Sequence, residues 1–215
     1  MQYSEAIQTI EKKLTQHSPQ RLKIPEFAPA AVVIPFLDIN SKAHILFTKR
    51  TETVEHHKGQ VSFPGGAWEE QDASLQETAL RETFEEVGIP QQMLNVIGQL
   101  DDFPTISNFL VTPFVAKMPY PYPTKISTDE VAEILEVPLE LFLTDKHFRL
   151  EERDIGSKKY PIYYYHFGPS VIWGVTGYII NRFIELVFEY NPAPTSIYHD
   201  PGAVDFMKDR IRRGE

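Results

Sequence analysis

One stretch of the chain decides the fold, Gly65 to Ile89, which reads GGAWEEQDASLQETALRETFEEVGI. Small and apolar side chains recur within it at helical spacing and predict a helix over 73–87. Gly88 follows as a C-terminal cap with Pro90 beyond it, and either Asp72 or Ser74 can cap the N-terminus. We expect one half of this helix to pack inward, formed by Leu75, Ala79, Leu80, Thr83, Phe84 and Val87.

Three carboxylates, Glu82, Glu85 and Glu86, fall side by side on this helix at positions i, i+3 and i+4. Like charges at these spacings repel, and the neighbouring Arg81 cannot neutralise all three. A hard divalent cation, Mg²⁺ or Mn²⁺, would make the cluster favourable, because such ions prefer carboxylate oxygens. The glycine pair before the helix lets the backbone approach a ligand, so that Gly66 can offer its carbonyl. For the helix alone, a solvated acidic stripe is the commoner interpretation.

The segments around this stretch alternate between strand and helix patterns, which is typical of a layered α/β domain. The apolar periodicity predicts an amphipathic helix over 4–16 and a long helix over 170–190. A short helix or strand is expected at 129–135, a loop or short strand at 58–66, and irregular chain after 190. Strands are predicted at 30–39, 43–50, 94–100 and 109–118, and a hairpin at 148–154 and 160–167.

Composition limits the classes of ligand and site that are plausible. The chain has 215 residues, no cysteine and a formal net charge of −9. The lack of cysteine excludes disulfides and thiolate metal sites, and the acidity argues against binding a nucleic-acid polymer or an anionic membrane. Neither a signal peptide nor an apolar run of about twenty residues is present. We therefore expect a cytoplasmic protein.

Residues 81–89 match the second half of the sequence box of the Nudix hydrolases, in which Arg-Glu precedes Glu-Glu by two residues and Gly follows. The sequence therefore resembles that family. Thr83 stands in an apolar slot, and Asp72 replaces the first Glu of the box, with eight residues between it and Arg81. This lengthened box is similar to the coenzyme A pyrophosphatase branch.

The same branch has a preceding pattern, which this chain follows at Leu46-Phe47-Thr48-Lys49-Arg50, Gly59 and Phe63-Pro64-Gly65-Gly66. Two positions depart from it: Thr51 stands where Ser or Ala is usual, and Glu55 stands where Arg is expected. The resemblance is carried by residues 46–89.

The resemblance implies a single domain over 1–215 with a mixed β-sheet sandwiched between helices, the helices at 4–16 and 170–190 being additions to it. It also implies metal-dependent hydrolysis of the diphosphate bond of coenzyme A or its derivatives, giving 3′,5′-ADP and 4′-phosphopantetheine. By resemblance, Glu82, Glu85, Glu86 and the Gly66 carbonyl hold Mg²⁺ or Mn²⁺, while Arg81, Glu85 and Glu86 are the catalytic residues. Arg81 would orient the carboxylates.

Basic residues before the box are candidates to bind the phosphates of the substrate. Lys49, Arg50, His56, His57 and Lys58 form the most basic local stretch, and a surface loop is the alternative interpretation. Arg50 is the strongest candidate because it matches the branch pattern. The substrate-binding residues expected from this region are Arg50, Lys58, Gly59 and Phe63.

The general base and the substrate are left open at this level. The base is one of the three box carboxylates, or Glu130 or Glu133, for which a plain surface position is the commoner interpretation. Tyr163, Tyr165 and Phe167 alternate on a strand and could stack on adenine, although core packing is more frequent. Alternative functions are a Nudix pyrophosphatase acting on ADP-ribose or another nucleoside diphosphate derivative, and a catalytically silent nucleotide-binding sensor. A homodimer is one possible assembly.

Overall fold

The fold is described from a computed structural model of the chain, in which residues 1–52, 58–155 and 158–192 are described, without the side chains of 154–155 and 158–160. The irregular chain expected beyond residue 192 lies outside the described residues, as do Glu55, His56 and His57. The described helices are α1 (Tyr3–Gln16), α2 (Leu75–Val87) and α3 (Gly174–Phe188). Three short 3₁₀ helices follow α2 or β8, at Gln91–Met93, Leu139–Leu143 and Asp145–His147.

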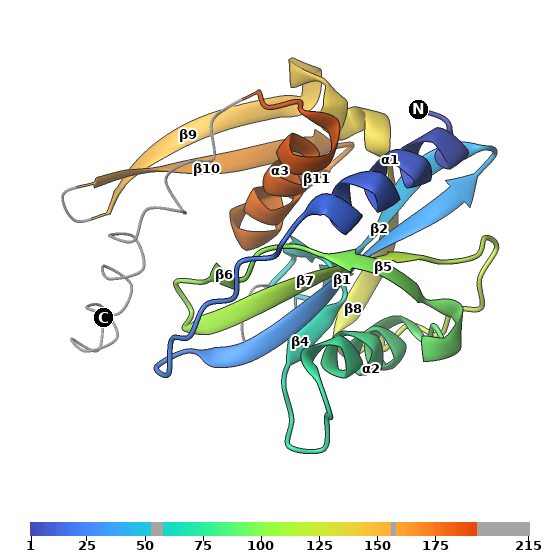
Figure 1. Cartoon of the computed structure of the whole chain (residues 1–215), viewed down its shortest axis with the longest axis horizontal. Coiled ribbons are helices and arrows are strands. Elements are labelled where there is room, and N and C mark those ends of the chain that lie inside the picture. Colours follow the sequence, from blue (N-terminus) through green and yellow to red (C-terminus); the bar gives the residue numbers. More distant parts are fainter. Residues whose placement is uncertain (53–57, 156–157, 193–215) are drawn as a thin grey trace.

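A large mixed sheet forms the centre of the molecule (Figure 1). Its path runs β3-β2-β1-β7-β5, with β4 paired to β1, β6 to β7 and β8 to β2. Strands β1 and β7 run parallel, whereas the other pairs are antiparallel. The strands of this sheet are β1 (Ala28–Ile39), β2 (Lys42–Arg50), β3 (Val61–Ser62), β4 (Gly65–Ala67), β5 (Asn95–Gln99), β6 (Phe103–Pro104), β7 (Phe109–Lys117) and β8 (Val131–Pro138).

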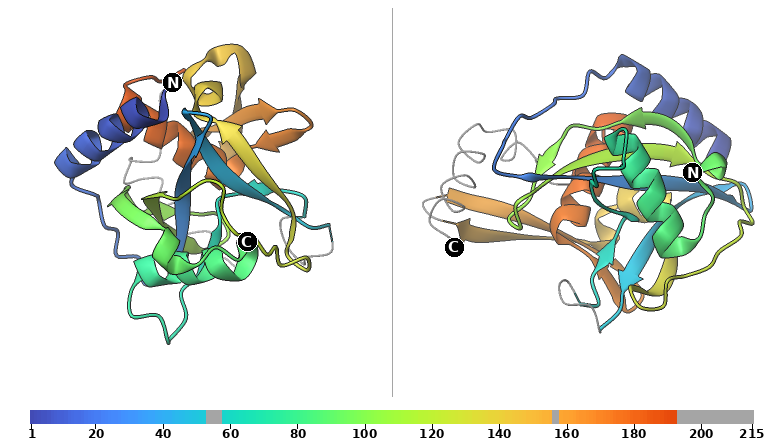
Figure 2. Two further views of the ribbon diagram at one scale, coloured as in Figure 1. Left: turned by 90° about the vertical axis from the view of Figure 1, so that its right-hand side faces the viewer. Right: turned by 90° about the horizontal axis from the view of Figure 1, so that it is seen from below.

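Helices cover both faces of this sheet, which confirms the predicted sandwich. Helix α2 lies on one face, and α1 and α3 lie on the other (Figures 1 and 2). Strand β1 shows why: Ala31 and Val33 pack toward α2, whereas Ile34 and Phe36 belong to the cluster that includes α1 and α3. A strand buried on both faces reads as a continuous apolar run, as 30–37 does.

Helix α1 lies in the main core of the molecule. Its side chains Ala6, Ile7, Ile10 and Leu14 are buried in the same cluster as Phe183 and Ile184 of α3. Leu14 packs so tightly on Gly98 of β5 that a Cβ there would collide with it. The packing of α1 therefore depends on the sheet and on α3, which arrive much later in the chain.

A second sheet of three strands, β11-β10-β9, carries the predicted hairpin, with β9 at Phe148–Ile155 and β10 at Lys158–Phe167. The third strand, β11 (Ser170–Ile172), corrects the helix predicted over 170–190. Ser170 to Ile172 pair with Phe167 to Tyr165 after a turn at Gly168, which has a φ of 55°. Helix α3 begins only at Gly174, because the apolar run 171–180 contains both a short strand and the first half of a helix.

The other predicted elements agree in type with the structure. The ambiguous segment 129–135 is a strand, β8, because it pairs antiparallel with β2 along most of its length. The segment 58–66 contains the short strands β3 and β4. Across the described residues, no helix combines the length and apolarity needed to cross a bilayer.

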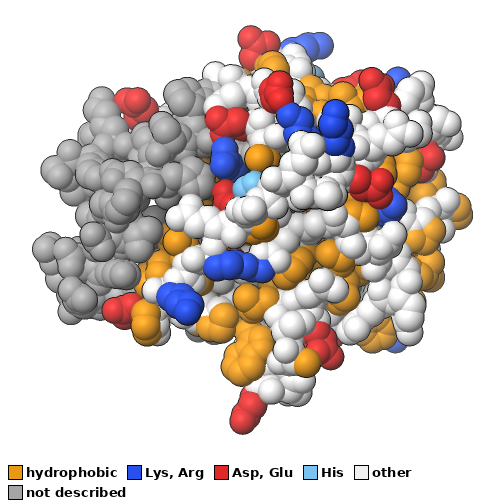
Figure 3. All heavy atoms as spheres, viewed as in Figure 1, with side chains coloured by type: hydrophobic (Ala, Val, Ile, Leu, Met, Phe, Trp, Pro, Cys, Tyr) orange, Lys and Arg blue, Asp and Glu red, His pale blue; other side chains and the backbone are white. Residues whose placement is uncertain are grey.

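Charged side chains of both signs are interspersed on the face shown in Figure 3. That face has no continuous basic patch among its described side chains, which is the surface that a nucleic-acid polymer would require.

Candidate active site

Helix α2 carries the site and is fixed at both ends. The Ser74 hydroxyl accepts a hydrogen bond from the Glu77 amide at 3.1 Å, so Ser74 rather than Asp72 is the N-cap. Gly88 ends the helix in the left-handed region, with a φ of 73°. A Cβ on Gly88 would lie 2.6 Å from the backbone nitrogen of Lys125, so this position also lets the loop after β7 approach closely.

The buried face of α2 is rotated from the expected one. Thr78, Ala79, Thr83, Glu86 and Val87 are buried, whereas Phe84 is 51% exposed. The prediction that Phe84 packs inward is wrong, because the sheet contacts the side of the helix on which Ala79, Thr83 and Glu86 project. Phe84 instead lines a shallow surface hollow with Pro90, Gln91 and Gln92. Apolar periodicity cannot detect this rotation, since it counts a buried glutamate as polar.

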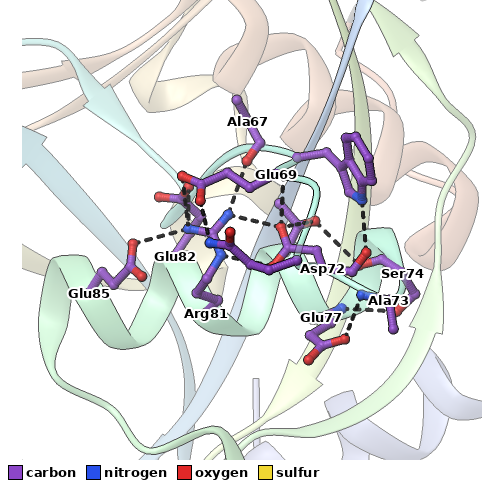
Figure 4. A network of polar contacts seen from close by, with 12 residues as sticks. Ala67, Glu69, Asp72, Ala73, Ser74, Glu77, Arg81, Glu82 and Glu85 are labelled. Atoms are coloured by element: carbon purple, nitrogen blue, oxygen red, sulfur yellow. Dashed lines mark hydrogen bonds and ion pairs between the residues drawn. The ribbon is translucent and has the colours of Figure 1, made fainter.

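Arg81 is the centre of a polar network in front of this helix (Figure 4). Its Nη1 donates to Glu82 at 2.9 Å and to Glu85 at 3.1 Å. Its Nη2 donates to the Ala67 carbonyl, which ties the helix to strand β4. Arg81 therefore contacts two of the three predicted carboxylates and fixes where they point.

Asp72 holds Arg81 from the opposite side, a role that the sequence did not reveal. Arg81 Nε and Nη2 each donate to one Asp72 oxygen at 2.9 Å, a two-point pairing that fixes the guanidinium plane. Asp72 is buried and also accepts from the Thr78 hydroxyl and the Glu69 amide. The hydrogen bonds from Arg81 hold the pKa of this carboxyl well below its usual range. One feature of the sequence could have pointed to this role. Asp72 replaces the longer Glu of the box and is separated from Arg81 by one additional residue, so the chain before the helix differs from that of the box.

Glu86 is the most enclosed of the three carboxylates. Its side chain is 3% exposed, and it accepts a hydrogen bond from the Gly65 amide at 3.3 Å. Burial raises the pKa of Glu86 to about 8. The pKa of Glu82 is raised as well, and burial is again the largest cause. Two adjacent carboxylates that are costly to ionise are suited to a cation that offsets this cost.

The glycine pair lies directly against these carboxylates. Gly66 has no room for a side chain, because a Cβ there would collide with the Glu82 carboxylate. Gly65, with a φ of 148°, is packed against the backbone of β1. Strand β4, which carries the Gly66 carbonyl, is therefore in contact with Glu82 and Glu86.

The three carboxylates do not converge on one point. Within the described residues, no three His, Cys, Asp or Glu side chains form a ready-made metal-binding group. Glu85 is half exposed and pairs with Arg81. Glu86 is buried and lies near a different arginine, Arg50. Their donor chemistry suits Mg²⁺ or Mn²⁺, and joint coordination requires Glu82 and Glu85 to turn from Arg81.

Arg50 lies at the end of β2 beside Glu86, with its Nη1 at 3.9 Å from a Glu86 oxygen. Its Nε is buried and has no hydrogen-bond partner among the described residues. The Arg50 side chain is 28% exposed, so its guanidinium is a candidate to bind an anion through the nitrogens other than Nε. Of the four predicted substrate-binding residues, Arg50 is the one placed at the carboxylates.

The other three are placed differently. Gly59 has a φ of 64°, and its amide donates to the Thr51 carbonyl, so it forms a turn beside β2. Lys58 is exposed next to it. Phe63 is buried and stacks on Phe47 with ring centroids 4.7 Å apart. Its ring therefore supports the glycine pair from inside the core, in contrast to the expected substrate contact.

The loop between β7 and β8 brings a further carboxylate to the site. Glu130 is exposed at the end of this loop, and its charge contributes to raising the pKa of both Glu82 and Glu86. Glu133 pairs with Lys49 in the β8–β2 ladder and is exposed on the sheet. The loop of Glu130 is bonded to α2, since the Ser127 amide donates to the Glu86 carbonyl and the Glu130 amide donates to the Ser127 carbonyl. The charge of Glu130 therefore acts on Glu82 and Glu86, whereas Glu133 is not among the causes of their pKa shifts.

The aromatic residues of β10 belong to the core. Tyr163 and Tyr165 are almost fully buried, as the more frequent interpretation predicts, and the Tyr165 hydroxyl donates to Asn181 of α3. Rings enclosed in this way cannot stack on an adenine.

Comparison with known proteins identifies the family of this chain. The model of the NUDIX domain matches residues 26–155, which is more than half of the chain. A protein of Photorhabdus laumondii named "Uncharacterized Nudix hydrolase NudL" is 37% identical over 158 residues, covering 74% of this chain and 84% of the relative. The protein of the same name from Cronobacter sakazakii is 38% identical over 156 residues, covering 71% and 79%. Among solved structures, a MutT/nudix family protein from Enterococcus faecalis is 14% identical, with a TM-score of 0.48 over 85% of this chain and 73% of that chain.

Proposed function

Because the chain belongs to the Nudix hydrolase family, we propose that this enzyme hydrolyses the diphosphate bond of coenzyme A or its derivatives, giving 3′,5′-ADP and 4′-phosphopantetheine. The observation that carries this proposal is the position of Arg50, whose partly unsatisfied guanidinium lies against Glu86. Arg50 belongs to the preceding pattern of the coenzyme A branch and lies beside a carboxylate of α2, whereas Gly59 forms a turn and Phe63 lies in the core.

The carboxylates Glu82, Glu85 and Glu86, with the Gly66 carbonyl, would hold Mg²⁺ or Mn²⁺. Such ions, when bound, neutralise a diphosphate and lower the pKa of a water molecule. Arg81 donates to Glu82 and Glu85 and is itself held by the buried Asp72. The chain's own contribution is therefore a set of carboxylate oxygens on a helix whose two ends are both fixed, of which Glu82 and Glu85 would exchange Arg81 for the metal.

Arg50 would bind a phosphate group of the substrate. Coenzyme A carries a 3′-phosphate besides its diphosphate, so its recognition needs cationic groups beyond the metal site. Arg50 and the exposed Lys58 lie on the two chain segments joined at Thr51 and Gly59. The net charge of −9 does not oppose this binding, because a small anion responds to local charges.

Glu130 is our candidate for the general base. The carboxylates of α2 are assigned to the metal ions, so that a base from another segment leaves the ligand set intact. Glu130 is the carboxylate outside α2 whose charge acts on both Glu82 and Glu86. Its exposed position keeps it accessible to water.

Substrate competition tests the proposal. The purified protein is incubated with coenzyme A, ADP-ribose or diadenosine tetraphosphate, each with Mn²⁺, with Mg²⁺ or with a chelator, and the products are separated by chromatography. We expect 3′,5′-ADP and 4′-phosphopantetheine from coenzyme A, formed only with metal. The Arg50→Glu variant is expected to raise the KM for coenzyme A far more than the KM for dephospho-coenzyme A, which lacks the 3′-phosphate.

Two results would contradict the proposal at different levels. Cleavage of ADP-ribose while coenzyme A stays intact would exclude the coenzyme A assignment within the family. Binding of nucleotides without any cleavage would instead indicate a catalytically silent sensor.

A further inference from the structure

Thr51 joins the end of β2 to the loop that carries Glu130. Its amide donates to the Glu130 carbonyl at 2.9 Å, and its hydroxyl donates to the Asp129 carbonyl at 2.9 Å. The first bond continues the β2–β8 ladder and is available to any residue except proline. The second bond requires a side-chain hydroxyl.

These two bonds hold the peptide groups on both sides of the Glu130 Cα. The Asp129 carbonyl belongs to the peptide plane before Glu130, and the Glu130 carbonyl belongs to the plane after it. A residue has two soft backbone dihedral angles, so holding both flanking planes fixes the direction of its Cα–Cβ bond. The Glu130 amide also donates to the Ser127 carbonyl at 3.0 Å.

The far part of the loop is held by α2 itself. The Ser127 amide donates to the Glu86 carbonyl, the Lys125 amide donates to the Val87 carbonyl, and the Thr124 hydroxyl donates to the Val87 carbonyl at 2.9 Å. In Figure 1 this connection runs from β7 past the C-terminal end of α2 to β8. The loop is thus bonded at one part to α2, which carries the carboxylates, and at its end to the residue that follows β2 and Arg50.

We propose that Thr51 is a positioning residue, whose hydroxyl holds the backbone that carries Glu130 in the loop bonded to α2. The inference rests on the proposed function, in which Glu130 acts as the base. It also gives a role to a residue that departs from the Ser or Ala usual at this position, because Thr retains the hydroxyl of Ser while its β-branched side chain has fewer rotamers.

The test compares Thr51→Val with Thr51→Ser and with the matched control Thr124→Val. Thr51→Val keeps the shape of the side chain and removes the bond to Asp129, whereas Thr51→Ser keeps it. Thr124→Val removes a bond of the same type from the same loop. We expect Thr51→Val to lower kcat by about 10-fold to 100-fold, the effect of a misplaced catalytic group, with little change in KM. Both Thr51→Ser and Thr124→Val should retain kcat, and melting temperatures should fall similarly in the two valine variants.

A double variant separates positioning from general weakening of the site. If Thr51 acts through Glu130, Thr51→Val combined with Glu130→Gln should have the kcat of Glu130→Gln alone. Multiplied losses in the double variant, or an unchanged kcat in Thr51→Val, would overturn the inference. Failure of the proposed function would look different, since the unmodified protein would then hydrolyse no coenzyme A with either metal.

Discussion

Asp72 shows how a residue outside the predicted set determines the geometry of the candidate site. It is buried under Arg81 and hydrogen-bonded by both donor atoms on one side of the guanidinium. Removing one partner from a buried ion pair leaves the other charge uncompensated, which costs about 3–5 kcal/mol. The positions of the Glu82 and Glu85 carboxylates therefore depend on Asp72, which acts on them through Arg81.

We predict that Asp72→Asn lowers the free energy of unfolding by about 3 kcal/mol at neutral pH. Since the folded-state pKa of Asp72 is depressed, its contribution is present above the unfolded pKa near 4 and is lost as the pH falls below that value. The difference between the variant and the unmodified protein should therefore narrow as the pH falls below about 5, and it should continue to narrow below about pH 3. Urea denaturation of both proteins at several pH values measures this difference in the free energy of unfolding.

Glu69→Gln is the matched control, because Glu69 pairs with the same arginine at 3.8 Å but is half exposed. Exposed ion pairs contribute about 0–1 kcal/mol, so this variant should stay near the unmodified protein. A constant difference between Asp72→Asn and the unmodified protein across the pH range would contradict the assignment.

Glu86 is the residue on which metal-dependent activity should depend most. It is the most enclosed box carboxylate and contacts the glycine pair. We predict that Glu86→Gln reduces metal-dependent turnover by orders of magnitude while the protein remains folded, as measured by kcat and circular dichroism. Glu133→Gln is the control on the exposed face of β8. Unchanged turnover in Glu86→Gln would disprove its role.

Helix α2 acts as a unit because both of its ends are fixed, and its C-terminal end also receives the loop after β7. Gly88 combines a left-handed φ with contact to the backbone of Lys125. The amides of Lys125 and Ser127 reach the last carbonyls of the helix, so the helix end and the Glu130 loop stabilise each other.

We predict that Gly88→Ala destabilises the protein by more than the strain of a left-handed alanine, about 1–2 kcal/mol. Gly168→Ala is the control, because Gly168 has a φ of 55° and an added Cβ meets nothing within 4 Å. Thermal and urea denaturation of the two variants isolates the collision with Lys125. Equal destabilisation would show that the loop adapts to the added methyl group.

The stability of the whole domain depends on α1 and α3, which lie before and after the segment 65–89 in the sequence. Helices α1 and α3 close the face of the sheet opposite α2, and Ile10 is fully buried among them. We predict that Ile10→Ala lowers the free energy of unfolding by about 2–5 kcal/mol. At temperatures well below melting, kcat and KM should remain those of the unmodified protein, because α2 lies on the other face.

Gln8→Ala provides the control, since Gln8 is exposed on the same helix. Calorimetry or urea denaturation measures both variants. A cost for Ile10→Ala below about 1 kcal/mol would mean that α1 is peripheral to the core.

The sequence by itself determined the type of most elements, the layered α/β class and the row of carboxylates on α2. These features depend on periodicity, turn residues and spacing, which are local. The spacing also indicates the contact of Arg81 with Glu85, because residues four apart on one helix are neighbours.

Only the tertiary structure decided which side of α2 faces the sheet, that Asp72 holds Arg81 and that the loop of Glu130 is bonded to α2. It also decided that residues 170–172 form a strand. Each of these results depends on partners distant in the chain, such as Gly65 for Glu86 and Thr51 for Glu130. Burial and pairing energies are set by such partners, whereas the periodicity of a segment records only its own side chains.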